Sequence, residues 1–148
     1  MNKIFKFISA SILGLLLTTG VFAKTEVVYI PKNTGNPYFD SIIKGFEVGA
    51  EKYGYNFSTV APATADATSQ LPFIKAEIQR GVDVIAISPN SNDALNTVFD
   101  QARKKGIIVM VVNGDIPGSE AHRDIAIMPV DFSTVGTAQM TLMGQLID

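Results

Sequence analysis

Short apolar runs alternate with longer amphipathic stretches along the chain from residue 24 onward. The runs 27–30 and 107–112 are continuously apolar rather than alternating in polarity, which is typical of strands buried on both faces of a sheet. The clearest predicted strand has a single charged residue, Asp83, near its entry. The predicted strands cover residues 27–30, 55–60, 82–87, 107–112 and 125–128.

Between these strands apolar residues recur at helical spacing, and each stretch carries a start or stop signal. Asn36 is a good N-cap, with Pro37 in the first helical position. The predicted helices cover 37–53, a segment from near Ser69 to Arg80, a segment through 95–105, and the chain from Ser133 to its end. The first three end at a glycine, a residue that readily takes the left-handed conformation of a helix end: Gly54, Gly81 and Gly106.

The three glycines are almost evenly spaced, and each leads directly into a predicted strand. This spacing indicates repeated β-α units, whose right-handed crossovers build a parallel sheet with helices on both faces. The predicted fold class is therefore α/β, a doubly wound parallel sheet.

The first 23 residues have the layout of a secretory signal peptide. Lys3 and Lys6 form a positive start, an apolar run follows over 7–17, and Val21-Phe22-Ala23 closes it with a small residue. The run is shorter than the roughly 18 residues that a membrane-spanning helix needs. We expect cleavage after Ala23 and a location in the periplasm.

Composition excludes several classes of site. The chain has no cysteine, so disulfides, thiolate zinc sites and cysteine nucleophiles are ruled out. It has one histidine and a formal net charge of −2, which argue against a multi-histidine metal site and a broad nucleic-acid-binding face. The dinucleotide and P-loop signatures are also missing, as is any nucleophile with its base. We therefore expect no enzyme activity, no metal and no cofactor.

Ligands of open parallel sheets bind at the carboxyl ends of the strands, near the point where the strand order reverses. The segments after the predicted strands are rich in Asn, Asp, Ser, Thr, Gly and Pro, namely 31–37, 61–66, 88–92 and 113–117. Their short hydrogen-bonding side chains suit a neutral polyhydroxyl ligand. Tyr38 and Phe39 open the first helix beside the first of these segments. One of the two is expected to pack on the C–H face of a sugar; the alternative is that both are core residues.

Lys32 and Asp115 follow the first and fourth predicted strands, which a doubly wound order can bring together. As a pair they would hold adjacent hydroxyls by charge-assisted hydrogen bonds. The alternative is a solvated lysine and a turn-forming aspartate, because Asn113-Gly114-Asp115 also has the chemistry of a turn.

The remaining chemically active side chains have simpler interpretations. His122 lies in a polar loop and is interpreted as a solvated residue. Met140 and Met143 are interpreted as packing residues of the last helix. The basic run 103–105 is interpreted as a helix end that complements the helix dipole, not as a phosphate site.

Three motifs follow one another behind the signal peptide: PKNTGNPYFDSIIKGFEVGAEKYGYNF (31–57), QRGVDVIAISPNSNDAL (79–95) and GIIVMVVNGD (106–115). In this order they resemble the periplasmic sugar-binding proteins of ABC transporters, the type I periplasmic binding proteins. Within the ribose-binding type, the chain is most similar to the rhamnose-binding and autoinducer-2-binding branch. The resemblance covers residues 25 to about 137, and the combination of motifs in order is specific although each motif alone is weak.

The resemblance implies the positions of the site. It places ligand-binding residues at Lys32, Asn36, Tyr38, Phe39, Asn113 and Asp115, and a hinge crossing at Asp131. A lysine after the first strand and an aspartate after the fourth are the mark of the autoinducer-2-binding branch. The ribose type has Asp-Arg where this chain has Asn113-Gly114, which counts against ribose or galactose as ligand.

The resemblance also implies the domain organisation and the partners. Family members have two α/β lobes that close around the ligand, and they are about twice as long as this chain. Residues 24–131 would form the N-terminal lobe, and 132–148 the first helix of a second lobe that is truncated here. The partners implied are a sugar and the permease of an ABC transporter in the inner membrane, with a monomer at full length. A single lobe would bind sugar weakly, and the last helix would expose an apolar face around Val135, Met140 and Leu146.

Other functions remain open at this point. The sensing lobe of a periplasmic receptor, for a chemotaxis or quorum signal, would share these motifs. A flavodoxin-like electron carrier is a remote alternative, because Thr34-Gly35-Asn36 resembles a phosphate loop that residues 37–39 would interrupt. A receiver-type signalling domain would need an aspartate where the third strand ends in Ser88. A transcription regulator of this fold would carry a helix-turn-helix in place of the signal peptide.

Overall fold

The computed structural model describes residues 23–91, 93–114, 118–129 and 131–147. Nearly all of the expected signal peptide lies outside the described residues, and so does Asp115. Within the described residues, no helix is both long and apolar enough to cross a membrane.

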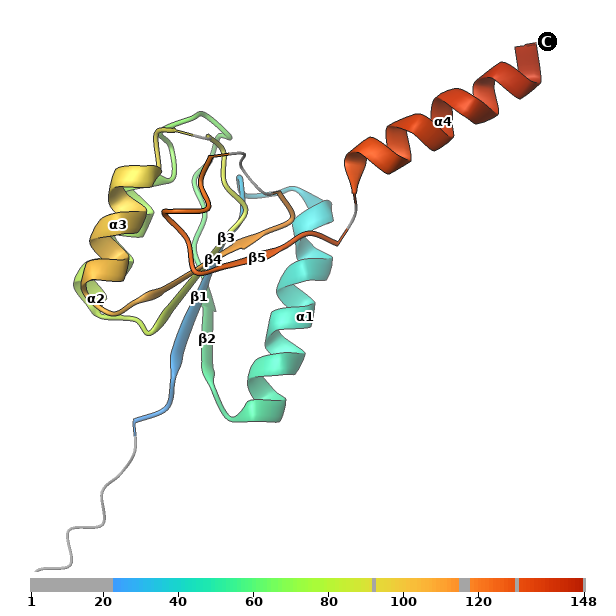
Figure 1. Ribbon diagram of the computed structural model, residues 1–148. Coiled ribbons are helices and arrows are strands. Elements are labelled where there is room, and N and C mark those ends of the chain that lie inside the picture. Colours follow the sequence, from blue (N-terminus) through green and yellow to red (C-terminus); the bar gives the residue numbers. More distant parts are fainter. Residues whose placement is uncertain (1–22, 92, 115–117, 130, 148) are drawn as a thin grey trace, which may run out of the picture.

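Five parallel strands form one sheet at the centre of the molecule (Figure 1). They are β1 (Glu26–Ile30), β2 (Asn56–Thr59), β3 (Val84–Ile87), β4 (Ile108–Val112) and β5 (Ile125–Ile127). Their order is β2-β1-β3-β4-β5, and in register Val28 lies beside Ile85 and Ile85 beside Val109. The chain leaves β1 to one side for β2 and crosses to the other side for β3. The strand order therefore reverses between β1 and β3, as in a doubly wound sheet.

Four helices accompany the strands: α1 (Pro37–Tyr53), α2 (Leu71–Arg80), α3 (Asn96–Lys104) and α4 (Phe132–Ile147). Asn36 caps α1, its side chain accepting a hydrogen bond from the Tyr38 backbone N–H at 3.1 Å. Gly54 and Gly81 end α1 and α2 with φ of 72° and 76°, as the sequence predicts. At α3 the C-cap is Lys105, and Gly106 takes the left-handed conformation one residue later.

The larger hydrophobic core lies between the sheet and the α2–α3 layer. Strand side chains that point to this face interlock with one stripe from each helix, and most are fully buried. Central members are Val28, Ile85, Val109, Ile74 and Phe99. Burial of these apolar side chains is the main stabilising contribution to the fold.

Among the described residues, α1 is the helix on the opposite face, mainly over β1 and β2. Tyr29 of β1, Phe46 of α1 and Phe57 of β2 form a ring stack there, with centroid distances of 5.0 and 5.5 Å. Helices thus lie on both faces of the sheet, as the sequence predicts. The second and third crossover helices, α2 and α3, both lie on the other face, and β4 and β5 keep exposed apolar side chains on the α1 side.

The last helix, α4, projects away from the sheet (Figure 1). Its start is fixed by Asp131, which accepts hydrogen bonds from the Ser133 backbone N–H at 3.0 Å and from Thr134 Oγ1 at 2.5 Å. The Thr134 hydroxyl is the main reason that the pKa of the Asp131 carboxyl is lowered. Val135, Met140 and Leu146 are exposed, as the sequence predicts.

The difference between the two faces predicts the cost of truncating their side chains. Replacing Ile85, fully buried between β3 and the α2–α3 layer, by alanine should lower the free energy of unfolding by about 3 kcal/mol. Replacing Ile108, which is exposed on the α1 side of β4, should cost less than about 1 kcal/mol. Urea denaturation followed by circular dichroism measures both. Equal losses would mean that the two faces are equally covered.

Candidate functional site

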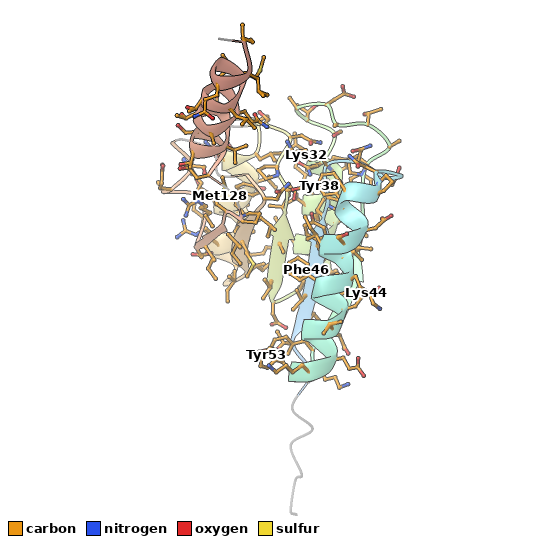
Figure 2. All side chains as sticks on the ribbon, turned by 90° about the vertical axis from the view of Figure 1, so that its right-hand side faces the viewer. Lys32, Tyr38, Lys44, Phe46, Tyr53 and Met128 are labelled. Carbon is orange, nitrogen blue, oxygen red and sulfur yellow. The ribbon has the colours of Figure 1, made fainter. Side chains whose placement is uncertain are left out.

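The carboxyl ends of the parallel strands meet at one edge of the sheet, where Figure 2 shows Lys32 and Tyr38. This edge includes the reversal point between β1 and β3. The segments that leave it are 31–36 after β1, 60–70 after β2, 88–95 after β3 and 113–124 after β4. The structure thus brings together the polar segments that the sequence places at strand ends.

A buried hydrogen-bond chain lies beneath this edge. The Ser88 hydroxyl, at the end of β3, donates to the Val112 carbonyl at 3.0 Å. The Tyr29 hydroxyl lies 2.8 Å from Ser88 Oγ and donates to it. Burial of the phenol raises the pKa of Tyr29 to about 12. These two hydrogen bonds join β1, β3 and β4, the three strands around the reversal point.

Gln70, fully buried just before α2, is the main link between the strand ends. Its side-chain amide donates to the carbonyls of Pro31 at 3.0 Å and Ser88 at 2.8 Å. Its side-chain oxygen accepts from the Asn90 backbone N–H at 2.9 Å. One side chain thus satisfies three backbone groups that diverge as β1 and β3 part.

Asn90 extends this link to the segment that carries Lys32. Its Nδ2 donates to the Lys32 carbonyl at 2.8 Å and to Ser69 Oγ at 3.1 Å. Its Oδ1 is buried and has no hydrogen-bond partner among the residues that the structure describes. The backbone of Lys32 is therefore held from β3, which fixes where the lysine side chain starts.

Tyr38 and Asn113 meet across the edge, from α1 and from the end of β4. The Tyr38 hydroxyl donates to Asn113 Oδ1 at 2.5 Å. Asn113 has φ of 62°, which few residues other than glycine adopt easily, and its backbone N–H donates to the Ile127 carbonyl at 2.9 Å. Tyr38 is 54% exposed, so one ring face remains open beside these polar groups.

Phe39 lies in a different environment from Tyr38. It is 4% exposed and packs with Tyr29, Ala86 and Val112 under the edge. Its ring meets Tyr38 edge-on, with centroids 5.3 Å apart. Of the two aromatic residues, Tyr38 is the one with a free face, and Phe39 supports it from below.

A shallow hollow of about 230 Å³ lies beside the start of α1. Asn36 and Phe39 line it together with Thr59 and Val60 from the end of β2. The Thr34 backbone N–H donates to the Pro62 carbonyl at 2.9 Å, which holds the two loops together over the hollow. The edge therefore presents short hydrogen-bonding groups, together with the charged Lys32, beside the Tyr38 ring.

Two further predictions concern the segment after β4. Asp115 lies outside the described residues, so its approach to Lys32 stays a prediction. His122 is not solvated as expected: its Nδ1 lies 2.9 Å from Asp100 Oδ1 on α3, and its side chain is only partly exposed. Arg103 of α3 pairs with Asp124 at 2.9 Å, so the segment is attached to α3 at two points.

The arrangement offers binding groups rather than reactive ones. No group of three or more metal-ligating side chains occurs among the described residues. Sequence reasoning missed Gln70 and Asn90, which shape the edge from below. A signal existed for Gln70, because it falls at the same helical position as Ile74 and Ile78, where a polar residue needs buried partners.

Comparison with known proteins bears on this geometry. The family described as "Periplasmic binding protein domain" matches residues 27–148. The chain is 32% identical over 111 residues to the D-allose-binding periplasmic protein of Escherichia coli K12, which is 74% of this chain and 36% of that protein. The two solved structures described next likewise match most of this chain and less than half of their own.

Two solved structures are similar in fold and sequence. An ABC transporter solute-binding protein from Burkholderia graminis in complex with D-arabinose is 31% identical with a TM-score of 0.78, covering 85% of this chain and 43% of that one. A solute-binding protein from Clostridium phytofermentas with bound L-rhamnose is 26% identical with a TM-score of 0.75, covering 82% and 37%. The chain thus spans less than half the length of these relatives, which are named as binding proteins rather than enzymes.

Removing the Gln70 amide should destabilise the edge. In Gln70→Leu three backbone groups lose their partners, and the free energy of unfolding should fall by about 3 kcal/mol. Gln79→Leu, an exposed change on the same helix, should cost less than about 0.5 kcal/mol. Chemical denaturation measures the free energy of unfolding of both variants. Similar losses in the two variants would mean that Gln70 does not link the strand ends.

Tyr29 should make the fold sensitive to alkali. Its pKa in the folded protein, about 12, lies above the ordinary value of 10.0, so the unfolded chain releases this proton first. The stabilisation is complete below pH 10 and is lost as the pH rises toward 12. Denaturation at several pH values should show this fall in the wild type and a smaller one in Tyr29→Phe. The same slope in both would assign the alkaline loss to other groups.

Proposed function

The chain belongs to the periplasmic binding protein domain family, and on this premise we propose that it captures a monosaccharide or similar polyol for an ABC transporter. The family and the doubly wound parallel fold are those expected from the sequence. The ligand would lie on the carboxyl edge of the sheet, and the permease in the inner membrane would receive it. The protein would act by binding alone, in the periplasm, after removal of residues 1–23.

The observation that carries this proposal is the exposed ring of Tyr38 beside a rim of short hydrogen-bonding side chains. A sugar has an apolar C–H face and a ring of hydroxyls, so it needs an aromatic surface and short hydrogen-bonding groups together. Tyr38 is held in place by Asn113 and supported by Phe39, which reduces the entropy lost when a ligand packs on it. Among the described residues of this edge, only Tyr38 and Asn113 pair an exposed aromatic ring on one element with a hydrogen-bonding side chain on another.

Three further groups would bind the hydroxyls. Lys32 extends from a backbone fixed by Asn90, and its ammonium would donate charge-assisted hydrogen bonds. The Asn36 side chain is half-buried at the hollow while it caps α1. Asp115, outside the described residues, would accept from the hydroxyl next to the one held by Lys32.

One edge supplies only one wall of a binding site. The chain covers 36% of its D-allose-binding relative, and sites of useful affinity enclose most of a small ligand. We propose that residues 24–131 form one lobe, that Asp131 marks a hinge crossing, and that 132–148 begin a second lobe. Binding by the 148-residue chain alone would then be weak, about 1 mM or poorer.

The proposal is tested by titrating the isotope-labelled chain with D-allose, D-arabinose and L-rhamnose and following its amide NMR signals. At least one sugar should shift signals of the carboxyl edge, including Asn36, Asn90 and Asn113. Tyr38→Ala should weaken this binding at least tenfold. Tyr53→Ala is the matched control, because Tyr53 is similarly exposed (63% against 54%) at the other end of α1.

Two results would contradict the proposal. Shifts confined to other surfaces, or none with any of the three sugars near their solubility limits, would mean that the edge binds no sugar of this class. Equal weakening by Tyr38→Ala and Tyr53→Ala would mean that the aromatic contact is not specific. Micromolar binding that Tyr38→Ala abolishes would support the ligand class but refute the one-wall argument.

A further inference from the structure

The side chains of the carboxyl edge that can reach a ligand present hydrogen-bond donors. A side-chain amide has one oxygen that accepts and one nitrogen that donates. At this edge the amide oxygens of Asn36 and Asn113 are bonded within the protein, so their nitrogens remain for a ligand. The residue types alone indicate a neutral polyhydroxyl ligand. The hydrogen bonds of the folded chain change that expectation.

The amide of Asn36 has its orientation fixed by the start of α1. Its Oδ1 accepts from the Tyr38 backbone N–H at 3.1 Å, and because that group can only donate, the amide oxygen must face it. Its Nδ2 has no hydrogen-bond partner in the part of the chain that the structure describes. The side chain is half-buried and lines the hollow beside α1. It therefore offers N–H groups to a ligand.

The amide of Asn113 is oriented by the same tyrosine from the end of β4. Its Oδ1 accepts from the Tyr38 hydroxyl at 2.5 Å, and its Nδ2 has no partner among the described residues. Tyr38 thus occupies both amide oxygens, one with its backbone N–H and the other with its hydroxyl. A sugar packed on the exposed Tyr38 ring would meet N–H groups from both amides.

Lys32 adds a positive charge to this edge, where Figure 2 shows it with Tyr38. Its ammonium can only donate, and it forms no ion pair with a described residue. The amide oxygens deeper in the edge are out of a ligand's reach. Gln70 Oε1 accepts from the Asn90 backbone N–H, and Asn90 Oδ1 is buried. Around the reversal point a ligand therefore faces one cation and two amide nitrogens.

The carboxylate that lines the hollow lies on a different side of α1. Asp40 follows Tyr38 by two residues, which is roughly 200° around the helix. Because Tyr38 points toward Asn113, Asp40 points away from it. Of the loop carboxylates, Asp66 accepts from a neighbouring threonine and Asp93 is exposed before α3. The edge thus has donors at one end and an acceptor for hydroxyls at the other.

We propose that the ligand of this edge is an acidic monosaccharide, a uronate or a similar sugar with one carboxylate, which lies against Lys32 and the Asn113 amide. The inference rests on the proposed function and specifies its ligand class. A carboxylate accepts several hydrogen bonds and donates none, whereas a hydroxyl brings a proton that these groups cannot accept. One ammonium matches one carboxylate, and such charge-assisted bonds are short and strong. Hydroxyls at the far end of the sugar would reach Asp40, and Asp115 keeps its proposed role with a hydroxyl.

Matched pairs of ligands test the inference on the isotope-labelled chain. The pairs are D-glucuronate with D-glucose, D-galacturonate with D-galactose, and D-mannuronate with D-mannose, each followed by the amide NMR signals of the carboxyl edge. At least one uronate should bind about tenfold more tightly than its neutral partner, because it gains charge-assisted hydrogen bonds. Sodium chloride at about 1 M, which screens charges beyond about 3 Å, should remove most of this preference.

Two variants remove the proposed carboxylate contacts and keep the fold. Asn113→Asp still accepts from the Tyr38 hydroxyl and tolerates the left-handed backbone, but it has no N–H to donate. Lys32→Met keeps the length of the side chain without its charge. Each variant should abolish the preference for the uronate. Lys75→Met is the matched control, since Lys75 is an exposed lysine on α2, and it should leave the preference unchanged. Circular dichroism shows whether each variant stays folded.

The outcomes separate this inference from the proposed function. Equal affinities within every pair, or tighter binding of the neutral sugars, would overturn the inference and leave the proposed function standing. A preference that persists in Asn113→Asp or in Lys32→Met, or one that Lys75→Met removes, would also overturn it. If the edge binds neither the uronates nor any neutral sugar, the inference and the proposed function both fail.

Discussion

The carboxyl edge depends on how its backbone groups are satisfied where β1 and β3 part. The two strands are paired up to Ile30 and Ile87, and the last hydrogen bond between them runs from the Ser88 N–H to the Ile30 carbonyl at 3.0 Å. Beyond it the Pro31 and Ser88 carbonyls and the Asn90 N–H bond to the Gln70 side chain instead of to a strand. Gln70 replaces those partners with a single side chain, and Ser88 ties the same region to β4. Without this junction the loops would need water or their own turns to satisfy the same groups. The shape of the candidate site therefore depends on how the fold satisfies these backbone hydrogen-bonding groups.

Much of the fold follows from short-range patterns. Asn36 and Pro37 predict where α1 begins, and Gly54 and Gly81 predict where α1 and α2 end, because caps depend on one or two neighbouring residues. The β-rich runs predict all five strands to within one or two residues of their bounds. What these patterns cannot predict is which face each helix takes. That depends on the strand order, and in the described residues it leaves Ile108 of β4 and Ile125 and Ile127 of β5 exposed on the α1 side.

The candidate site was also predictable in part, because the ends of parallel strands can be located from the sequence. The strand-end rule brings Lys32, Asn36, Tyr38 and Asn113 to one edge, where the structure has them. The difference between Tyr38 and Phe39 depends on a single 100° step around α1, and so one ring is open and its neighbour buried. His122 could not be placed from sequence, since its partner Asp100 lies on an element distant along the chain. Long-range side-chain pairs leave no local pattern.

The left-handed backbone of Asn113 limits how this edge can change during evolution. Its φ of 62° admits glycine, asparagine and aspartate far more readily than other residues, and of these glycine has no side chain to accept from Tyr38. Two independent constraints therefore meet at one position. A lineage that acquires a new ligand would keep asparagine or aspartate here and vary the freer positions around it. The selectivity of such proteins can then diverge while the frame that presents the ligand stays the same.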